Sequence, residues 1–222
     1  YSSDPDTVAK LGAAFAKGML DHGVMPTAKH FIGDGSVVYG TGEGNNLIDR
    51  GDAKLSDASL EGLLKPYRAL LNEGVKVVMA SHSSVNGVKM HANKHLLTDV
   101  LKGEMNFDGF VVSDWESVEN IPGASLEDKL ASAINAGIDM LMQPENCPEC
   151  LQLITNAVKK GSIPQARIDD AVKRILTVKY GMGLFDDPMG KNKKREVTDV
   201  GSQKYRDIAR QLVEESLVLV KN

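Results

Sequence analysis

The order of the apolar patterns is the property of this sequence that limits its fold most strongly. Repeats with helical spacing alternate with short β-branched runs. Strand-like runs occur at residues 27–32, 75–81, 109–113 and 138–142. Between them, apolar side chains recur at the three- and four-residue spacing of an amphipathic helix, for example over residues 60–71. Regular alternation of this kind predicts parallel βα units.

Several of the expected helices carry start or stop signals. Asp4 and Pro5 supply a cap and a first-turn proline for a first helix that ends near Gly23. Ser125 precedes a helix with an apolar stripe, and Pro164 opens a later one. From residue 185 to residue 200 the chain turns polar, which we interpret as a linker before a last helix.

The fold class follows from the number of these units. The chain is expected to be α/β, with about four βα units of a TIM-type (βα)8 barrel; a doubly wound sheet is the alternative. A closed barrel takes eight strands and about 250 residues, so four strands would leave an exposed sheet edge. We therefore expect the barrel to be completed by a preceding N-terminal half, another chain or a second copy, and the first residue, Tyr1, agrees with a missing start.

Composition excludes several classes of function. The chain is 42% hydrophobic and 25% charged, as is usual for a globular protein, and its formal net charge is −4. Acidic and basic residues are interspersed, so no basic stripe is expected to bind nucleic acid. Apolar runs end far short of the roughly 18 residues that cross a bilayer, so no membrane partner is expected either.

Polar side chains follow the strand-like runs. Lys29 and His30 end the first run, His82 follows the second, and Asp114 and Trp115 follow the third. In βα barrels the active site lies at the carboxyl ends of the strands, so these side chains are expected to converge. A carboxylate that attacks an anomeric carbon, charged groups that bind hydroxyls and an indole that stacks on a ring suit sugar chemistry.

Longer motifs support a family resemblance. They are AKHFIGDG at 28–35, NGVKMHAN at 86–93, GFVVSDW at 109–115, AGIDM at 136–140, RIDDAVKRIL at 167–176 and SLVLVKN at 216–222. With these ordered motifs the sequence resembles glycoside hydrolase family 3, in particular its β-glucosidase and exo-β-glucanase branch. The resemblance covers nearly the whole chain.

The resemblance implies a role for each polar residue. Asp114 would be the nucleophile of a retaining hydrolase that removes β-linked glucose through a covalent glycosyl-enzyme. Lys29 and His30 would bind hydroxyls of the nonreducing-end sugar, and Trp115 would stack on the substrate. His82 falls where many relatives carry a tyrosine, and we include it among the substrate-binding residues. No organic cofactor and no metal are implied.

The resemblance also implies a domain organisation. Residues 1–186 would be the C-terminal part of the barrel domain, and residues 187–222 an interdomain linker and the first helix toward a second α/β domain. That domain would carry the glutamate acid/base, because Glu116 lies past the strand end and is not expected to supply the second carboxyl group. The expected partners are a β-glucoside or β-glucan and the remainder of the enzyme. The segment alone is predicted to be inactive; a periplasmic or secreted location is suggested only by the family.

Three alternatives remain open. A hexosaminidase of the same family is disfavoured, because residues 33–46 lack the histidine of that branch. A catalytically silent carbohydrate-binding or structural fragment is a second hypothesis. A thiol redox protein that uses Cys147 and Cys150 is the third, although such domains are much shorter.

Structural roles compete with the functional ones. Asp114 could simply cap a helix, Trp115 could be a core residue, and His82 could be a structural imidazole. We expect His91 to be structural and Asp139 to close a turn or to pair with a neighbour.

Overall fold

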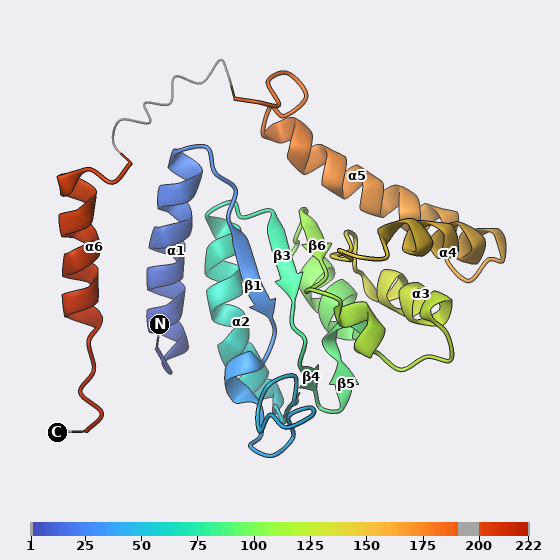
Figure 1. Cartoon of the computed structure of the whole chain (residues 1–222), viewed down its shortest axis with the longest axis horizontal. Helices are drawn as coiled ribbons and strands as arrows, with labels where there is room; N and C mark the ends of the chain where they lie inside the picture. Colours follow the sequence, from blue (N-terminus) through green and yellow to red (C-terminus); the bar gives the residue numbers. More distant parts are fainter. Residues whose placement is uncertain (1, 191–199, 222) are drawn as a thin grey trace. The chain divides into compact units, whose positions relative to one another are not determined.

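The computed structural model describes residues 2–190 and 200–221 (Figure 1). The chain divides into two compact units, Tyr1–Met182 and Gly183–Asn222, and each is described by itself. Part of the predicted linker, residues 191–199, lies outside the described residues. None of the described helices combines the length and the apolar character needed to span a bilayer.

A parallel sheet forms the centre of the first unit. Its strand order is β1 (Thr27–Phe31), β3 (Val77–Ala80) and β6 (Phe110–Val112). Both pairings are parallel, and Met140 extends the sheet through an isolated parallel bridge to Val112. The four predicted runs therefore lie side by side in chain order, but the fourth is a single bridge rather than a strand. The mixed α/β class with a parallel sheet is confirmed.

The end of β1 departs from regular pairing. Thr27 and Ala28 pair with Val77 and Val78, and the register then shifts before Phe31. The Lys29–His30 and Phe31–Ile32 peptide bonds are both cis. Irregular backbone thus begins where the polar residues of the first motif occur.

Helices cover the sheet and follow the predicted pattern closely. They are α1 (Pro5–Asp21), α2 (Asp57–Asn72), the π-helix η3 (His95–Glu104), α3 (Leu126–Ala136), α4 (Cys147–Lys159) and α5 (Gln165–Gly181). The side chain of Asp4 accepts hydrogen bonds from the first turn of α1, and Ser125 caps α3, as predicted. Helices α1 and α2 lie side by side against one side of the sheet (Figure 1).

The first unit has a continuous apolar core between sheet and helices. Phe31 of β1, Val78 of β3 and Val111 of β6 are completely buried there, and Leu97 and Leu130 reach it from η3 and α3. Burial of side chains this large supplies the main stabilisation of such a unit. The strands are thereby fixed, and so are the loops that follow them.

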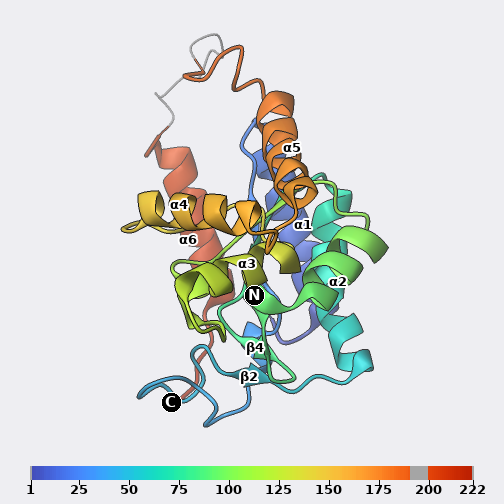
Figure 2. The ribbon, with the colours of Figure 1, turned by 90° about the vertical axis from the view of Figure 1, so that its right-hand side faces the viewer.

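A second, smaller sheet was not predicted. It consists of β2 (Asp52–Ala53), β4 (Ser84–Val85) and β5 (Val88–Lys89), and its two central turn residues, Asn86 and Gly87, have φ of 51° and 85°. Asn-Gly between apolar residues is a strong hairpin signal, but it falls between the longer helical and strand-like runs. Figures 1 and 2 show this sheet at one end of the first unit, beyond the end of β3.

Among its described residues, the second unit contains one helix, α6 (Gln203–Ser216). Its start follows the predicted polar stretch. The unit boundary at Met182 and Gly183 comes shortly before the predicted domain boundary at residue 186.

Candidate active site

The candidate site is a cleft of about 450 Å³ at the carboxyl ends of the strands. Its lining comes from the ends of all three strands and from the long loop that precedes β2: His30, Asp34, Ile48, Asp49, Arg50, His82, Ser83 and Asp114. Three of the five residues predicted for the site therefore meet in one cleft. They are His30, His82 and Asp114.

Asp114 follows β6 and is fixed through both its backbone and its side chain. Its backbone N–H donates to Nε2 of His91 at 2.9 Å, and its Oδ1 accepts the N–H of Trp115 at 2.7 Å. Its Oδ2 lies 3.5 Å from Nε2 of His30 and 3.5 Å from Nε2 of His82. One carboxylate oxygen is thus tied to the backbone, while the other lies between two imidazoles in the cleft.

His30 belongs to a polar chain that begins on the neighbouring strand. Its Nδ1 lies 3.0 Å from Oδ2 of Asp34, and the hydroxyl of Ser81 donates to the other oxygen of Asp34. The hydrogen bond to Asp34 raises the pKa of His30. Burial would raise the pKa of Asp34, but the hydrogen bonds from His30 and Ser81 outweigh it and hold that pKa below its usual value. His30 therefore favours its charged form beside Asp114.

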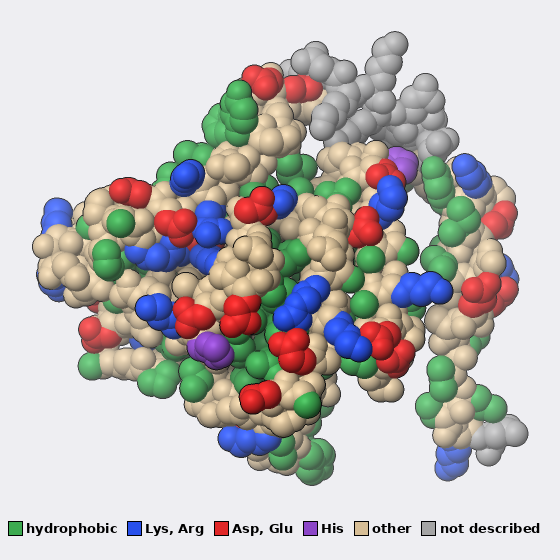
Figure 3. Space-filling model, turned by 180° about the vertical axis from the view of Figure 1, so that it is seen from behind, with side chains coloured by type: hydrophobic (Ala, Val, Ile, Leu, Met, Phe, Trp, Pro, Cys, Tyr) green, Lys and Arg blue, Asp and Glu red, His purple; other side chains and the backbone are tan. Residues whose placement is uncertain are grey.

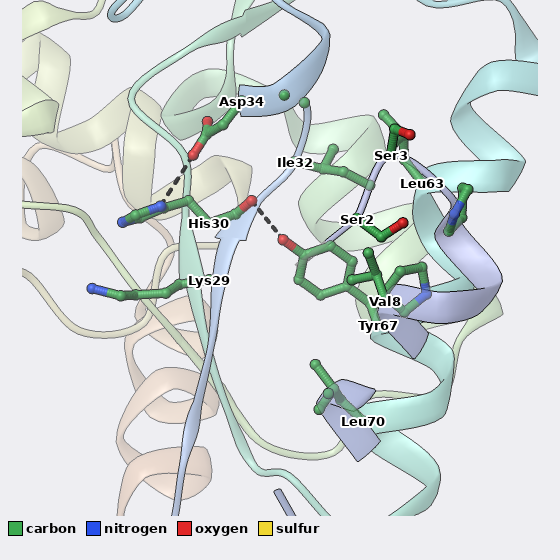
Figure 4. A pocket seen from close by; sticks show the side chains of 15 residues that line it. Ser2, Ser3, Val8, Lys29, His30, Ile32, Asp34, Leu63, Tyr67 and Leu70 are labelled. Atoms are coloured by element: carbon green, nitrogen blue, oxygen red, sulfur yellow. Dashed lines mark hydrogen bonds and ion pairs between the residues drawn. The ribbon is translucent and has the colours of Figure 1, made fainter. Parts of the chain in front are cut away.

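The backbone of His30 is held from the opposite side. Tyr67 of α2 donates its hydroxyl to the carbonyl oxygen of His30 at 2.5 Å, as Figure 4 shows beside the contact between His30 and Asp34. Because the phenol and the imidazole lie on opposite sides of β1, the strand end is anchored while the imidazole stays free to face the cleft.

The two remaining imidazoles near Asp114 differ in burial. Burial lowers the pKa of His82, although the charge of Asp114 opposes it. His91 is almost completely buried, and burial lowers its pKa to about 4. A neutral His91 can accept the N–H of Asp114, so its expected structural role agrees with the geometry.

Lys29 and Trp115 are placed differently from the other predicted residues. Lys29 is exposed and lines a neighbouring cavity of about 340 Å³ between β1, α1 and α2, although its side chain points to the same side of β1 as His30 (Figure 4). Trp115 is 55% exposed, so the alternative that it is a core residue is wrong. Neither residue is part of the cleft lining around Asp114.

Sequence reasoning missed several residues of the cleft. Asp49 and Arg50 come from a loop with no regular pattern, and Arg50 has a left-handed backbone with φ of 59°. Only the folded chain brings this loop over β3. In the sequence Asp34 is only one member of the motif AKHFIGDG, yet its position four residues after His30 gives the i,i+4 contact that fixes the imidazole.

Comparison with known proteins now decides the family. Residues 1–178 match the model of the Glycosyl hydrolase family 3 N terminal domain. The chain belongs to glycoside hydrolase family 3. Among curated members of the family, it is 35% identical to a beta-xylosidase of Formosa agariphila and 34% identical to a periplasmic beta-glucosidase of Salmonella typhimurium.

Solved family 3 structures agree with this assignment. The exo-1,3/1,4-beta-glucanase of a Pseudoalteromonas species matches with a TM-score of 0.88 and 37% identity over 100% of this chain and 28% of that chain. The beta-glucosidase of Listeria innocua in complex with gluconolactone matches with a TM-score of 0.86 and 27% identity, over 100% of this chain and 31% of that one. The match to the Formosa relative covers 100% of this chain but 32% of the relative, and the Salmonella match covers 100% and 30%. The chain thus spans about a third of these relatives.

Family membership also weighs against the thiol redox hypothesis. Cys147 and Cys150 are both free, and Cys150 is buried. Burial raises the pKa of the Cys150 thiol, which disfavours the reactive thiolate.

Within the described part of the chain, no group of three or more histidine, cysteine or carboxylate side chains is arranged to hold a metal ion.

Proposed function

We propose that the enzyme to which this segment belongs is a retaining glycosidase that removes β-linked glucose from the nonreducing end of oligosaccharides or glucosides. One observation carries the proposal. The carboxylate of Asp114 lies at the carboxyl end of β6 with Oδ2 in the cleft, while Oδ1 is held by the backbone of Trp115. An oriented carboxylate of this kind suits attack on an anomeric carbon.

The proposed reaction has two steps at Asp114. In the first, Oδ2 bonds to the anomeric carbon while the glycosidic bond breaks, and the departing oxygen takes a proton from a general acid. In the second, water gives its proton to the same group, attacks the anomeric carbon and releases Asp114. His30 and Lys29 would hold hydroxyls of the sugar by charged hydrogen bonds, and the exposed indole of Trp115 would stack on the substrate.

The general acid is not assigned to Asp34, a carboxyl group that lines the same cleft. Asp34 bonds to His30 and Ser81, and these bonds hold its pKa below the usual value. A carboxyl group that stays ionised is a poor proton donor near neutral pH. We assign the acid/base role to a glutamate of the second domain, as family membership suggests, and the partner of this segment is then the rest of the enzyme.

Trapping the nucleophile tests this proposal. The full-length protein would be incubated with 2-fluoro glucoside and 2-fluoro xyloside reagents, the second because one relative is a beta-xylosidase. We expect the label on the peptide that contains Asp114, since fluorine slows release of the covalent intermediate. Asp114→Asn should abolish both labelling and turnover.

A matched control uses another carboxylate. Asp99 belongs to η3 and its side chain is 57% exposed. The Asp99→Asn variant should therefore be labelled on the Asp114 peptide to the same extent as the parent protein. Label on a different peptide, or full activity of Asp114→Asn, would exclude Asp114 as the nucleophile. A folded full-length protein with neither labelling nor turnover of any β-glycoside would favour the silent-fragment hypothesis.

A further inference from the structure

His82 is held at both of its ring nitrogens. Nδ1 makes a hydrogen bond with the hydroxyl of Ser117 in η4 (Ser117–Asn120), and Nε2 lies 3.5 Å from Oδ2 of Asp114. A carboxylate can only accept, whereas a serine hydroxyl can donate or accept. The favourable arrangement therefore has Ser117 donating to Nδ1 and the imidazole proton on Nε2, directed at Asp114.

The two imidazoles beside Asp114 are not equivalent. The side chain of His30 is 32% exposed and is bound to Asp34, whereas that of His82 is 20% exposed and is bound to Ser117. His30 thus has the more open position and a carboxylate that favours its charged form. His82 has the more enclosed position and a neutral partner.

We propose that His82 is a positioning residue for Asp114, a neutral donor that orients Oδ2 and stabilises its anionic form, rather than a contact of the sugar. This inference rests on the proposed function, because it gives Asp114 its role as nucleophile. His82 then completes a set that holds Asp114 at three points, two on its carboxylate and one on its backbone. The other members are His91 at the backbone N–H of Asp114 and the N–H of Trp115 at Oδ1.

The present distance of 3.5 Å is long for a hydrogen bond. Catalytic hydrogen bonds are often long in free enzymes and shorten when substrate binds. A small rotation of the Asp114 carboxylate is enough to change this distance, since Ser117 already fixes the imidazole. A hydrogen bond from Nε2 of His82 would then hold Oδ2 of Asp114 in the orientation from which it attacks the anomeric carbon.

The charged surroundings of His82 favour a neutral imidazole. The titratable and charged groups that face it are Asp114, Arg50, Asp49, His30 and His91. Burial lowers the pKa of His82, and Arg50 and His30 act in the same direction, while Asp114 and Asp49 oppose them. At neutral pH the ring therefore has a single proton. The hydrogen bond from Ser117 to Nδ1 places this proton on Nε2.

Loss of a positioning donor at His82 and loss of a sugar contact there have different effects on catalysis. A hydrogen bond to a charged group is worth about 1.5–3 kcal/mol, so loss of the donor should lower kcat/KM roughly 10- to 100-fold. It should also move the acidic limb of the pH profile of activity upward, because donation favours the carboxylate. Loss of a sugar contact would instead weaken glucose binding and leave the acidic limb of the pH profile unchanged.

The test uses the full-length protein with an aryl β-glucoside. His82→Phe removes the donor and His82→Gln restores one, and His95→Gln is the control because His95 is exposed and bound to Asp99 on η3. We expect His82→Phe to lower kcat/KM 10- to 100-fold and to move the acidic limb of its pH profile upward. His82→Gln should recover at least part of both effects, and the inhibition constant for glucose should change less than 2-fold.

Ser117→Ala gives an independent measurement that keeps the imidazole in place. With Nδ1 no longer bound, the ring can adopt the other tautomer, so a smaller shift of the acidic limb in the same direction is expected. An acidic limb that stays at the parental pH in both His82→Phe and Ser117→Ala would overturn the proposal, as would a change confined to glucose binding. Failure of the proposed function is distinct, because parent and Asp114→Asn would then have the same activity.

Discussion

At the scale of single residues, the candidate site depends on the different charge states of three histidines. Hydrogen bonding to Asp34 raises the pKa of His30, while burial lowers that of His91 to about 4. His91 must stay neutral to accept the backbone N–H of Asp114. The shift of His91 corresponds to a cost on the order of 3 kcal/mol for charging it in the folded state. The unfolded chain therefore binds a proton at His91 more readily than the folded chain does. As a result, the free energy of unfolding falls as pH drops from 6.5 toward about 4.

Asp34→Asn tests the charge state of His30. The raised pKa of His30 contributes stability below the usual histidine pKa of 6.5, and this contribution is lost as pH rises through the folded value. The lowered pKa of Asp34 contributes stability above 3.8, lost as pH falls through the folded value. The variant should therefore lose most stability relative to the parent between pH 3.8 and 6.5.

Two measurements check this expectation. An NMR titration of the imidazole should show the pKa of His30 moving down in Asp34→Asn, and denaturation at several pH values should show the difference in stability narrowing above the folded pKa of His30. An unaltered His30 pKa would mean that Asp34 does not control the imidazole.

At the scale of elements, Asp139 connects the sheet to two helices. Its side chain is 0% exposed and contacts Nζ of Lys102 in η3 at 2.8 Å, the guanidinium of Arg167 in α5 and the backbone N–H of Val111 in β6 at 2.8 Å. The sequence-based expectation that Asp139 pairs with a neighbour is confirmed. Burial lowers the pKa of Lys102 to about 8, and Asp139 opposes this shift. This carboxylate offsets the cost of two cations close to the core.

Asp139→Asn should therefore destabilise the first unit strongly. It leaves the buried cation of Lys102 without its anion and removes one of the two carboxylates that contact Arg167, the other being Asp170. Breaking a buried pair costs about 3–5 kcal/mol. Urea denaturation would measure the loss. Asp21→Asn breaks an exposed pair with Lys17, whose contact is 2.7 Å, and should cost far less stability because solvent screens that pair. Equal losses for the two variants would contradict the structural role of Asp139.

At the scale of the whole molecule, the first unit presents apolar side chains on its outer helices. Leu11 and Phe15 of α1 are 48% and 63% exposed, and Val172 and Leu176 of α5 are 47% and 45% exposed. Strand β1 pairs with β3 alone among the described strands. Elsewhere, acidic and basic side chains are intermixed over one face (Figure 3). The apolar positions and the open strand edge are suited to contact with further parts of a barrel domain.

The isolated 222-residue segment should therefore be inactive and self-associating. Without the acid/base glutamate that we assign to the second domain, the leaving oxygen has no proton donor, so an aryl β-glucoside should not be hydrolysed at an ordinary enzyme rate. Light scattering should show oligomers whose size falls when Phe15→Ser is introduced, whereas Val88→Ser, at an exposed hairpin position, should have less effect. A monomeric segment that turns over the glucoside would refute this expectation.

The sequence by itself determined the units of this fold. Helical spacing, the caps Asp4 and Ser125 and the β-branched runs predicted the helices and three parallel strands, because these signals are local. Ordered motifs also identified the family. The fourth run was predicted as a strand but forms only the bridge at Met140, and the Asn86-Gly87 hairpin was missed although its turn signal is local.

Only the tertiary structure decided what surrounds Asp114. His30 and His82 are separated from it along the chain, and they meet at its carboxylate because adjacent parallel strands end at the same edge of the sheet. His91 reaches its backbone N–H from the short helix η2 (Met90–Ala92), which follows the hairpin. The role of Ser117 as the partner of His82 depends on the distance between two side chains that lie 35 residues apart in the sequence. Such distances are set by packing across the strands, and spacing along a single chain does not encode them.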